Sequence, residues 1–249
     1  MTERTANRRL LGLCSVLALL LAAAPVFAQQ GDNREPPAVS KAHFTGDFGA
    51  SFDSIDDVDR QSFTGGSTFY APVADVFGIA VGGDLGFGAV EGDFGEVVGV
   101  HGAGFWRDPR SGYIGAALTF DHVSDFQRVN VSAIGGAYLN DWDLMSAAGY
   151  DGGDGPGVGL FSFETGYYLT SNLRLGGELA FGTDDTISGG GLIHWQPAPD
   201  SPVTLSAHVG GGELDNTGFY AVSLGLTVTF SDRKSLRDQL RTDRLLIFD

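Results

Sequence analysis

The chain has 249 residues, of which 43% are hydrophobic and only 18% are charged, and its formal net charge is −16. This acidic excess argues against nucleic acid as a partner, because phosphate binding requires a basic surface. The single cysteine, Cys14, lies in the N-terminal apolar segment. The chain beyond that segment therefore has no residue for disulfides, thiol catalysis or cysteine-ligated zinc.

Residues 1–28 have the organisation of a secretory signal peptide. Three arginines precede an apolar run over residues 10–24, and Ala28 closes a Val-Phe-Ala cleavage sequence. A retained membrane anchor is disfavoured, because the run is short for a spanning helix and Pro25 ends it. Cleavage near Ala28 removes one acid and three bases, so the net charge falls from −16 to −18.

The next segment, residues 29–42, is polar and contains Pro36-Pro37. We expect a disordered periplasmic lead-in here. Beyond it, residues 43–230 place apolar side chains at alternate positions in segment after segment, and a period of two indicates β-strands. The expected strands, with a total of ten or fourteen left open, are 43–52, 63–73, 76–87, 97–106, 113–120, 128–139, 142–150, 157–169, 173–182, 186–195, 203–211 and 218–230.

These strands predict an all-β fold, a single transmembrane antiparallel up-and-down β-barrel in the outer membrane of a Gram-negative cell. One face of the strands is apolar and carries no charge, and the other is mostly Gly, Ala, Ser and Thr. A soluble barrel would show that second face to water, where far more charge is usual. With the apolar face turned to lipid the contradiction disappears, so outer-membrane lipid is an expected partner. The strand 97–106 fits either register.

The connections alternate in character. Short turns such as Ala74-Asp75 and Asn140-Asp141 alternate with acidic segments such as 53–60 and 121–126, which we expect to be the longer outer loops. All three tryptophans, Trp106, Trp142 and Trp195, adjoin short turns and indicate an aromatic girdle at the periplasmic end. An even number of strands places both termini at that end.

The inner face contains most of the charges of the strands. The residues that we expect to face the lumen are Asp47, Asp84, Asp143, Glu164, Glu178, Arg128 and Arg174. Ordinary lumen packing and ion pairing is one interpretation of this set. The functional interpretation is a charged constriction of the kind that channels use.

The final strand ends in an ordered pattern of polar, glycine, apolar and aromatic positions: Ser223, Gly225, Val228 and Phe230. This pattern resembles the assembly signal on the terminal strand of bacterial outer-membrane proteins. The resemblance implies that the barrel-assembly machinery is a partner during biogenesis. Residues 231–249 follow the signal, which is a departure from its usual terminal position.

The chain from residue 29 onwards also resembles a group of small proteobacterial outer-membrane, porin-like barrels without an established activity. The resemblance implies fold and location and brings no catalytic residue. The stretches that carry it are the turn and tail sequences Phe105–Pro109, Tyr168–Leu175, Trp195–Pro199 and Lys234–Arg237.

The tail, residues 231–249, mixes bases and acids, and Leu236, Leu240 and Leu245 indicate a helical stripe. Docking to the periplasmic mouth or to a partner is one interpretation, and the polar composition favours a frayed terminus.

No motif for catalysis, a cofactor or a metal accompanies the strands, so we expect no enzyme activity and no cofactor. His194 and His208 share a face with Ser188 and Ser206, but no motif connects them into a hydrolase. The leading hypothesis is a narrow, passive, cation-preferring channel for ions or small polar solutes, because acids outnumber arginines on the inner face. A closed structural or surface-interaction barrel is the alternative, and an outer-membrane hydrolase is third. The oligomeric state is left open.

Overall fold

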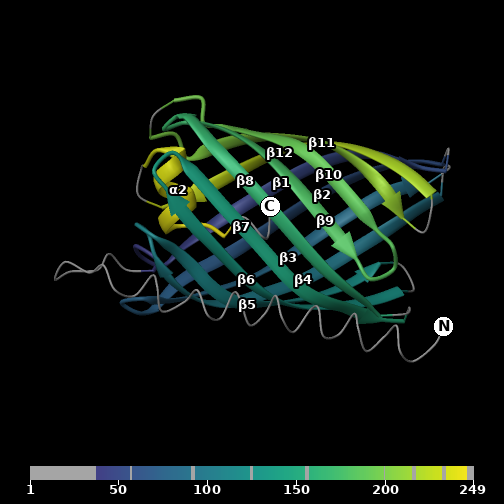
Figure 1. Cartoon of the computed structure of the whole chain (residues 1–249), viewed down its shortest axis with the longest axis horizontal. Helices are drawn as coiled ribbons and strands as arrows, with labels where there is room; N and C mark the ends of the chain where they lie inside the picture. The colour runs from purple at the N-terminus through teal and green to yellow at the C-terminus, as the bar shows by residue number, and fades with distance from the viewer. Residues whose placement is uncertain are drawn as a thin grey trace.

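The computed structural model describes residues 38–245 except 57, 91–92, 124–125, 155–156, 199, 215–216 and 232–233. The predicted signal peptide, residues 1–28, and residues 29–37 lie outside the described residues. Twelve strands form a closed antiparallel barrel (Figure 1). The strands are β1 (His43–Ile55), β2 (Val58–Ala74), β3 (Phe77–Val90), β4 (Asp93–Asp108), β5 (Gly112–Val123), β6 (Phe126–Leu139), β7 (Trp142–Gly153), β8 (Val158–Thr170), β9 (Leu173–Gly182), β10 (Ile187–Trp195), β11 (Val203–Leu214) and β12 (Thr217–Phe230).

Each strand pairs with its sequence neighbours, and β1 pairs with β12 to close the ring. The closing ladder runs without a break from Phe44 opposite Phe230 to Ile55 opposite Phe219. Closure removes every free edge, so all strand backbone groups can be paired within the ring. The predicted twelve-stranded up-and-down barrel is confirmed.

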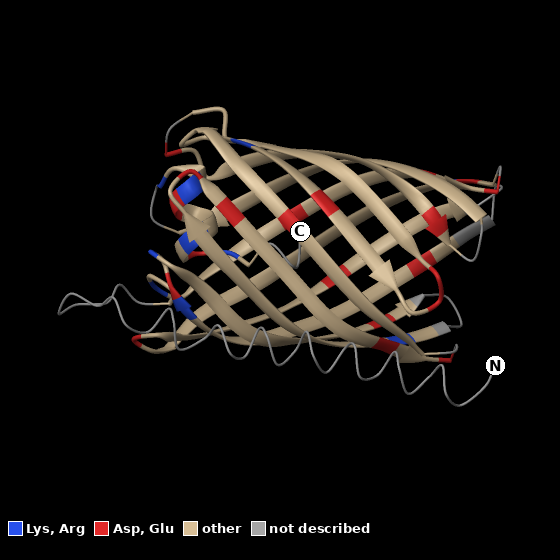
Figure 2. Ribbon diagram, in the orientation of Figure 1, with Lys and Arg blue, Asp and Glu red and all other residues tan. Residues whose placement is uncertain are grey.

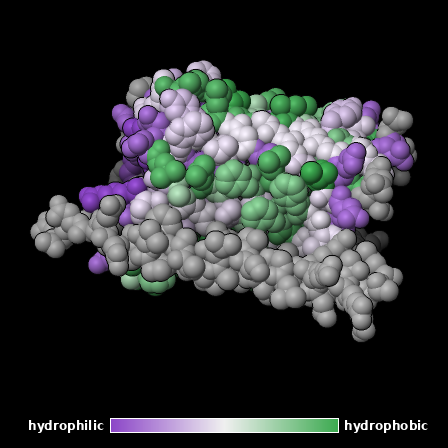
Figure 3. Space-filling model, viewed as in Figure 1, coloured by the Kyte–Doolittle hydropathy of each residue, from purple (hydrophilic) through white to green (hydrophobic). Residues whose placement is uncertain are grey.

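The outer face is apolar because alternate residues of each strand point away from the lumen. Phe48, Val81 and Leu224 are more than half exposed, and similar side chains cover the strands between the two ends (Figure 3). The structure also decides the register of β4, where Val98 and Val100 are exposed and His101 and Phe105 are buried. The described part of the chain has no helix of the length and apolarity required to span a membrane.

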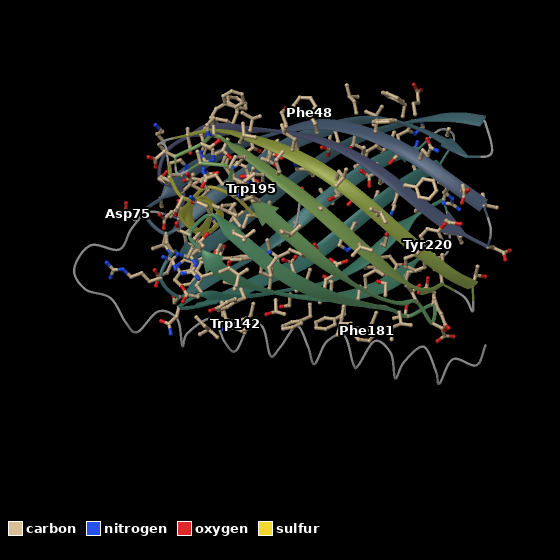
Figure 4. All side chains as sticks on the ribbon, turned by 90° about the horizontal axis from the view of Figure 1, so that it is seen from above. Phe48, Asp75, Trp142, Phe181, Trp195 and Tyr220 are labelled. Carbon is tan, nitrogen blue, oxygen red and sulfur yellow. The ribbon has the colours of Figure 1, made fainter. Side chains whose placement is uncertain are left out.

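The two ends of the barrel differ in their connections. We call the end with connections 75–76, 109–111, 140–141, 171–172 and 196–202 the turn end, and the opposite end the tip end. Trp142 and Trp195 lie at the turn end with Asp75 (Figure 4), and Trp106 is three residues before the 109–111 turn.

The expectation of longer outer loops at the tip end is wrong. Most of the residues assigned to them extend the strands instead; Asp53, for example, pairs with Arg60. Backbone ladders continue there without an apolar outer face, and the alternation that identifies strands in the sequence therefore ends before the strands do.

In its described part, the tail is not a frayed end. Residues Leu236–Thr242 form helix α2, which lies at the turn end and has buried Leu236, Gln239 and Leu240 (Figure 1). Ser235 caps its N-terminus by accepting a hydrogen bond from the Asp238 amide. A helical stripe in seven residues is too short to predict docking, because the surface that buries it is formed only when the barrel closes.

The expected disordered lead-in also differs from the structure in its described part. Ala38 and Val39 are fully buried, and the Ala38 amide donates to the Asp75 carbonyl. They join an apolar cluster that contributes to filling the turn end. Its other members are Tyr70, Ala80, Ala103, Phe105, Tyr113, Ala117, Ile134, Tyr138, Met145 and Leu245.

Candidate functional site in the barrel lumen

Three aspartates face the lumen along one row of paired residues, which rises from near the turn end at Asp47 to near the tip end at Asp121. Asp47 on β1 is opposite Gly66 on β2, and Gly66 is opposite Asp84 on β3. The same row continues from Asp84 to Gly99 on β4 and then to Asp121 on β5. We call Asp47, Asp84 and Asp121 the acidic row. Because neighbouring strands lie about 4.8 Å apart, successive acids of the row are separated by about 10 Å between Cα atoms.

The two glycines provide the space that the carboxylates occupy. A Cβ atom at Gly99 would lie 2.8 Å from Asp121 Oδ1 and 3.5 Å from Asp84 Oδ2. A Cβ at Gly66 would collide with Asp84 Oδ1. The carboxylates therefore lean over glycine backbone, and larger residues at these positions would displace them.

A cavity of about 260 Å³ adjoins the acidic row. Asp47, Asp84 and the tail residue Arg244 line it, with hydroxyl side chains from β1, β2, β11 and β12. Two of its lining side chains are more than nine-tenths buried and have no hydrogen-bond partner among the described residues: Thr204 through Oγ1 and His194 through Nδ1. The hydroxyl residues are Ser51, Ser62, Thr64, Thr204, Ser206, Ser223 and Thr227.

A second charged cluster lies nearer the turn end. The Arg174 side chain is fully buried, donates to Glu164 Oε1 at 2.6 Å and lies 3.8 Å from Asp143 Oδ2. Asp143 Oδ1 also accepts from the tail residue Arg241 at 2.8 Å. Two arginines balance two carboxylates in this cluster, although Arg174 Nε and Nη1 have no hydrogen-bond partner among the described residues, and the cluster joins the barrel wall to the tail.

The remaining residues predicted to face the lumen form pairs in more open surroundings. Glu178 Oε1 lies 2.9 Å from His208 Nε2, and Arg128 bonds to Asp151. The side chains of Glu178 and Asp84 are 40% and 44% exposed, whereas that of Arg174 is 0% exposed. Solvent therefore reaches the lumen from the tip end, and the turn end is filled.

Sequence reasoning missed Asp121, Arg107 and Arg244. The sequence predicts Asp121 in an acidic outer loop, although it continues the alternation of β5 by one further step. Arg107 was read as a turn residue; it is fully buried beside the rings of Phe105 and Tyr113. No local signal identifies Arg244, because its neighbours Asp47, Arg107 and Thr227 lie on three different strands that only the closed barrel brings together.

The four residues of the assembly-signal resemblance divide between the two faces of β12. Ser223 and Gly225 line the cavity wall, and Phe230 is 65% exposed at the turn end. Val228 lies on the same face of the strand as Phe230, opposite Gly46 of β1.

The histidines considered for a hydrolase lie on the inner face. His194 is opposite Ser206, and His208 is opposite Ser223. Within the described residues, neither ring is hydrogen-bonded to a serine. In the same part of the chain, no group of three or more His, Cys, Asp and Glu side chains is placed to hold a metal ion.

Comparison with solved structures identifies the fold. An outer-membrane channel from Pseudomonas putida F1 superposes with a TM-score of 0.61 at 11% identity, covering 81% of this chain and 99% of the channel. The KdgM porin superposes with a TM-score of 0.54 at 12% identity over 74% of this chain and 99% of the porin. The chain has the fold of outer-membrane porins and channels.

The same fold also serves other purposes. The translocator domain of the autotransporter NalP from Neisseria meningitidis superposes with a TM-score of 0.53 at 10% identity, over 88% of this chain and 97% of the domain. No family model and no curated protein sequence matches the chain. Function must therefore be argued from the lumen, because a fold alone does not determine it.

Proposed function

We propose that the protein is a passive channel in the outer membrane of a Gram-negative cell, for ions or small polar solutes and with a preference for cations. The acidic row carries this proposal. Its carboxylates face a lumen that solvent enters from the tip end, and those of Asp47 and Asp84 line a polar cavity. Along the strands, isolated acidic residues interrupt stretches without charge (Figure 2).

Electrostatics supports cation preference. Asp84 is bonded at 3.0 Å to His101, whose ring carries no full charge unless protonated. The strand arginine next along the row, Arg128, is already bonded to Asp151. Like charges around a narrow lumen with low-dielectric walls concentrate the opposite ion. Cations are therefore favoured over anions along the acidic row.

Location and biogenesis complete the proposal. The apolar outer face fits a lipid environment, since one mid-depth charge there would cost roughly 2–4 kcal/mol. On this proposal the signal peptide directs export and is cleaved near Ala28, and the barrel-assembly machinery then inserts the barrel into the outer membrane. On this proposal the protein is a channel and not an enzyme.

A second candidate is a closed structural barrel. The turn end favours it, because the buried apolar cluster and helix α2 fill this end among the described residues. The two candidates predict different behaviour in a membrane.

Planar bilayer recording of the purified full-length protein tests the proposal. We expect discrete conductance steps, with a reversal potential that has the sign of cation preference under a KCl gradient. The preference should weaken at high salt, because the carboxylates are then screened. Anion preference would reject the electrostatic argument. The absence of conductance from verified folded protein, with or without its tail, would favour the closed barrel.

A further inference from the structure

The tail is the basic segment of an acidic chain. Residues 234–245 contain Lys234, Arg237, Arg241 and Arg244 against Asp238 and Asp243, a net charge of +2. The barrel that surrounds this segment is strongly acidic. The tail is therefore electrostatically complementary to the lumen that it enters.

Arg241 binds the tail to the barrel wall. Its guanidinium donates to Asp143 Oδ1 at 2.8 Å and to the Asn140 carbonyl at 2.7 Å, and it lies over the rings of Tyr138 and Tyr168. Asp143 is buried, so this interaction is screened weakly. At the rim, Arg237 donates to Asp141 Oδ1 at 2.7 Å.

Arg244 extends from the tail to the acidic row itself. Its guanidinium donates to Thr227 Oγ1 at 3.1 Å and lies 4.0 Å from Asp47 Oδ1. Thr227 and Asp47 are opposite each other on β12 and β1, so the guanidinium lies at one end of the row. The Arg244 carbonyl accepts from buried Arg107 at 2.6 Å, which holds this part of the tail in place.

A cation thus already lies beside Asp47, and it belongs to the chain. The same cavity has hydroxyl side chains on its wall, and buried Thr204 Oγ1 has no hydrogen-bond partner among the described residues. Oxygen atoms of carboxylates and hydroxyls are suited to alkali cations and to planar guanidinium alike. The surroundings of Asp47 therefore have the chemistry of a cation-binding site.

We propose that the cavity beside Asp47 is a cation site of the channel, which residues 234–245 close by placing Arg244 in it, and that withdrawal of this segment opens the site to permeating cations. This inference rests on the proposed channel function. In the closed state the tail fills the turn end and neutralises part of the acidic row. In the open state both effects are lost together, so conductance and cation selectivity rise together.

A reversible cross-link tests the inference on the full chain. Asp141→Cys with Arg237→Cys places two thiols at the turn end, one on the barrel and one on the tail, and cleavage of the signal peptide removes the natural cysteine. A bismaleimide with an internal disulfide would join them. The single variant Arg237→Cys, treated in the same way, is the control.

We expect the cross-linked protein to stay at the low conductance level. Reduction of the linker should restore openings, with a several-fold higher open probability and stronger cation preference. The linked protein should also show no block by millimolar guanidinium, whereas the reduced protein should be blocked reversibly. Equal conductance before and after reduction would overturn the gating role.

A truncated chain ending at Ser231 separates this inference from the proposed function. The ladder between β1 and β12 ends at Phe230, so the truncated barrel retains all its strand pairing. If the truncated barrel conducts and reduction of the linker does not change the conductance of the full-length protein, only the gating role of the tail is rejected. Silence of both the truncated barrel and the reduced full-length protein, each verified as folded, rejects the channel and the gate together.

Discussion

Asp47 and Asp84 lie on opposite sides of Gly66, on β1 and β3, and line the same cavity in the lumen. Because their charges act on the same part of the lumen, removing both should affect ion selectivity more than conductance. For Asp47→Asn with Asp84→Asn we expect the reversal potential under a KCl gradient to shift toward zero. The matched control is Asp75→Asn, a change at an exposed turn residue. Equal shifts in the two proteins would contradict the role of the row.

Gly99 and Gly104 on β4 provide a matched pair of substitutions. A Cβ at Gly99 would meet Asp121 Oδ1 at 2.8 Å, whereas a Cβ at Gly104 would meet no atom within 4 Å. Gly99→Ala should displace the Asp121 carboxylate and weaken cation preference, at a small cost in stability because the atom that it meets is the end of a side chain and not backbone. Gly104→Ala should change neither. Reversal potentials and thermal unfolding in detergent measure the two effects.

Buried Asp143 should contribute far more to stability than exposed Asp141, although each bonds to a tail arginine. Asp143→Asn leaves Arg174 and Arg241 without their shared carboxylate, and breaking a buried pair costs roughly 3–5 kcal/mol. Asp141→Asn breaks an exposed pair and should cost about 0–1 kcal/mol. Thermal unfolding of both variants tests the ranking. Combination with Arg241→Gln should recover part of the Asp143→Asn loss.

Phe230→Ala should reduce the folded fraction of the barrel. Its side chain ends the last strand at the turn end and is 65% exposed, so its loss removes little packing from the closed barrel. A reduced amount of the heat-modifiable band in gels would thus indicate impaired assembly. Leu224→Ala, on the same outer face of β12 and 63% exposed, is the control. If both variants lose the band equally, the effect is one of general hydrophobicity.

The docked tail should be sensitive to acid through Asp243. Burial alone would raise the pKa of this carboxyl, but the Ser40 hydroxyl and the Lys234 ammonium, with a smaller contribution from His43, lower the pKa below its ordinary 3.8. A lowered pKa stabilises the docked state fully above the ordinary value, and this stabilisation is lost as the pH falls below 3.8 and through the folded pKa.

We therefore expect the tail to become accessible to an acid-active protease only below about pH 4. The groups that contact the Asp243 carboxylate are Ser40, Ser231, Lys234 and Thr242. Asp243→Asn should expose the tail to some extent at all pH values and flatten the pH dependence. An unchanged acid response in that variant would assign the effect to another group.

From the sequence by itself, the secretion signal stays an expectation, whereas the predicted barrel is confirmed by the structure. Alternation such as that of Tyr220, Val222 and Leu224 is a local property of a strand, and each strand repeats it independently. Twelve repetitions, an uncharged outer face and an aromatic end at Phe230 are enough to specify a closed membrane barrel. The inward direction of Asp47 and Asp84 follows from the same parity.

Tertiary structure alone decided which charges meet. The row shared by Asp47, Gly66 and Asp84 depends on the register of three strands, and a one-residue slip in any of them would turn its side chains to the other face. The position of Arg244 depends on more still, because its neighbours Thr227 and Asp47 come together only when β1 pairs with β12. In the sequence, a short polar tail has the composition of a frayed end. The acidic surface that binds it exists only after the ring of strands has closed.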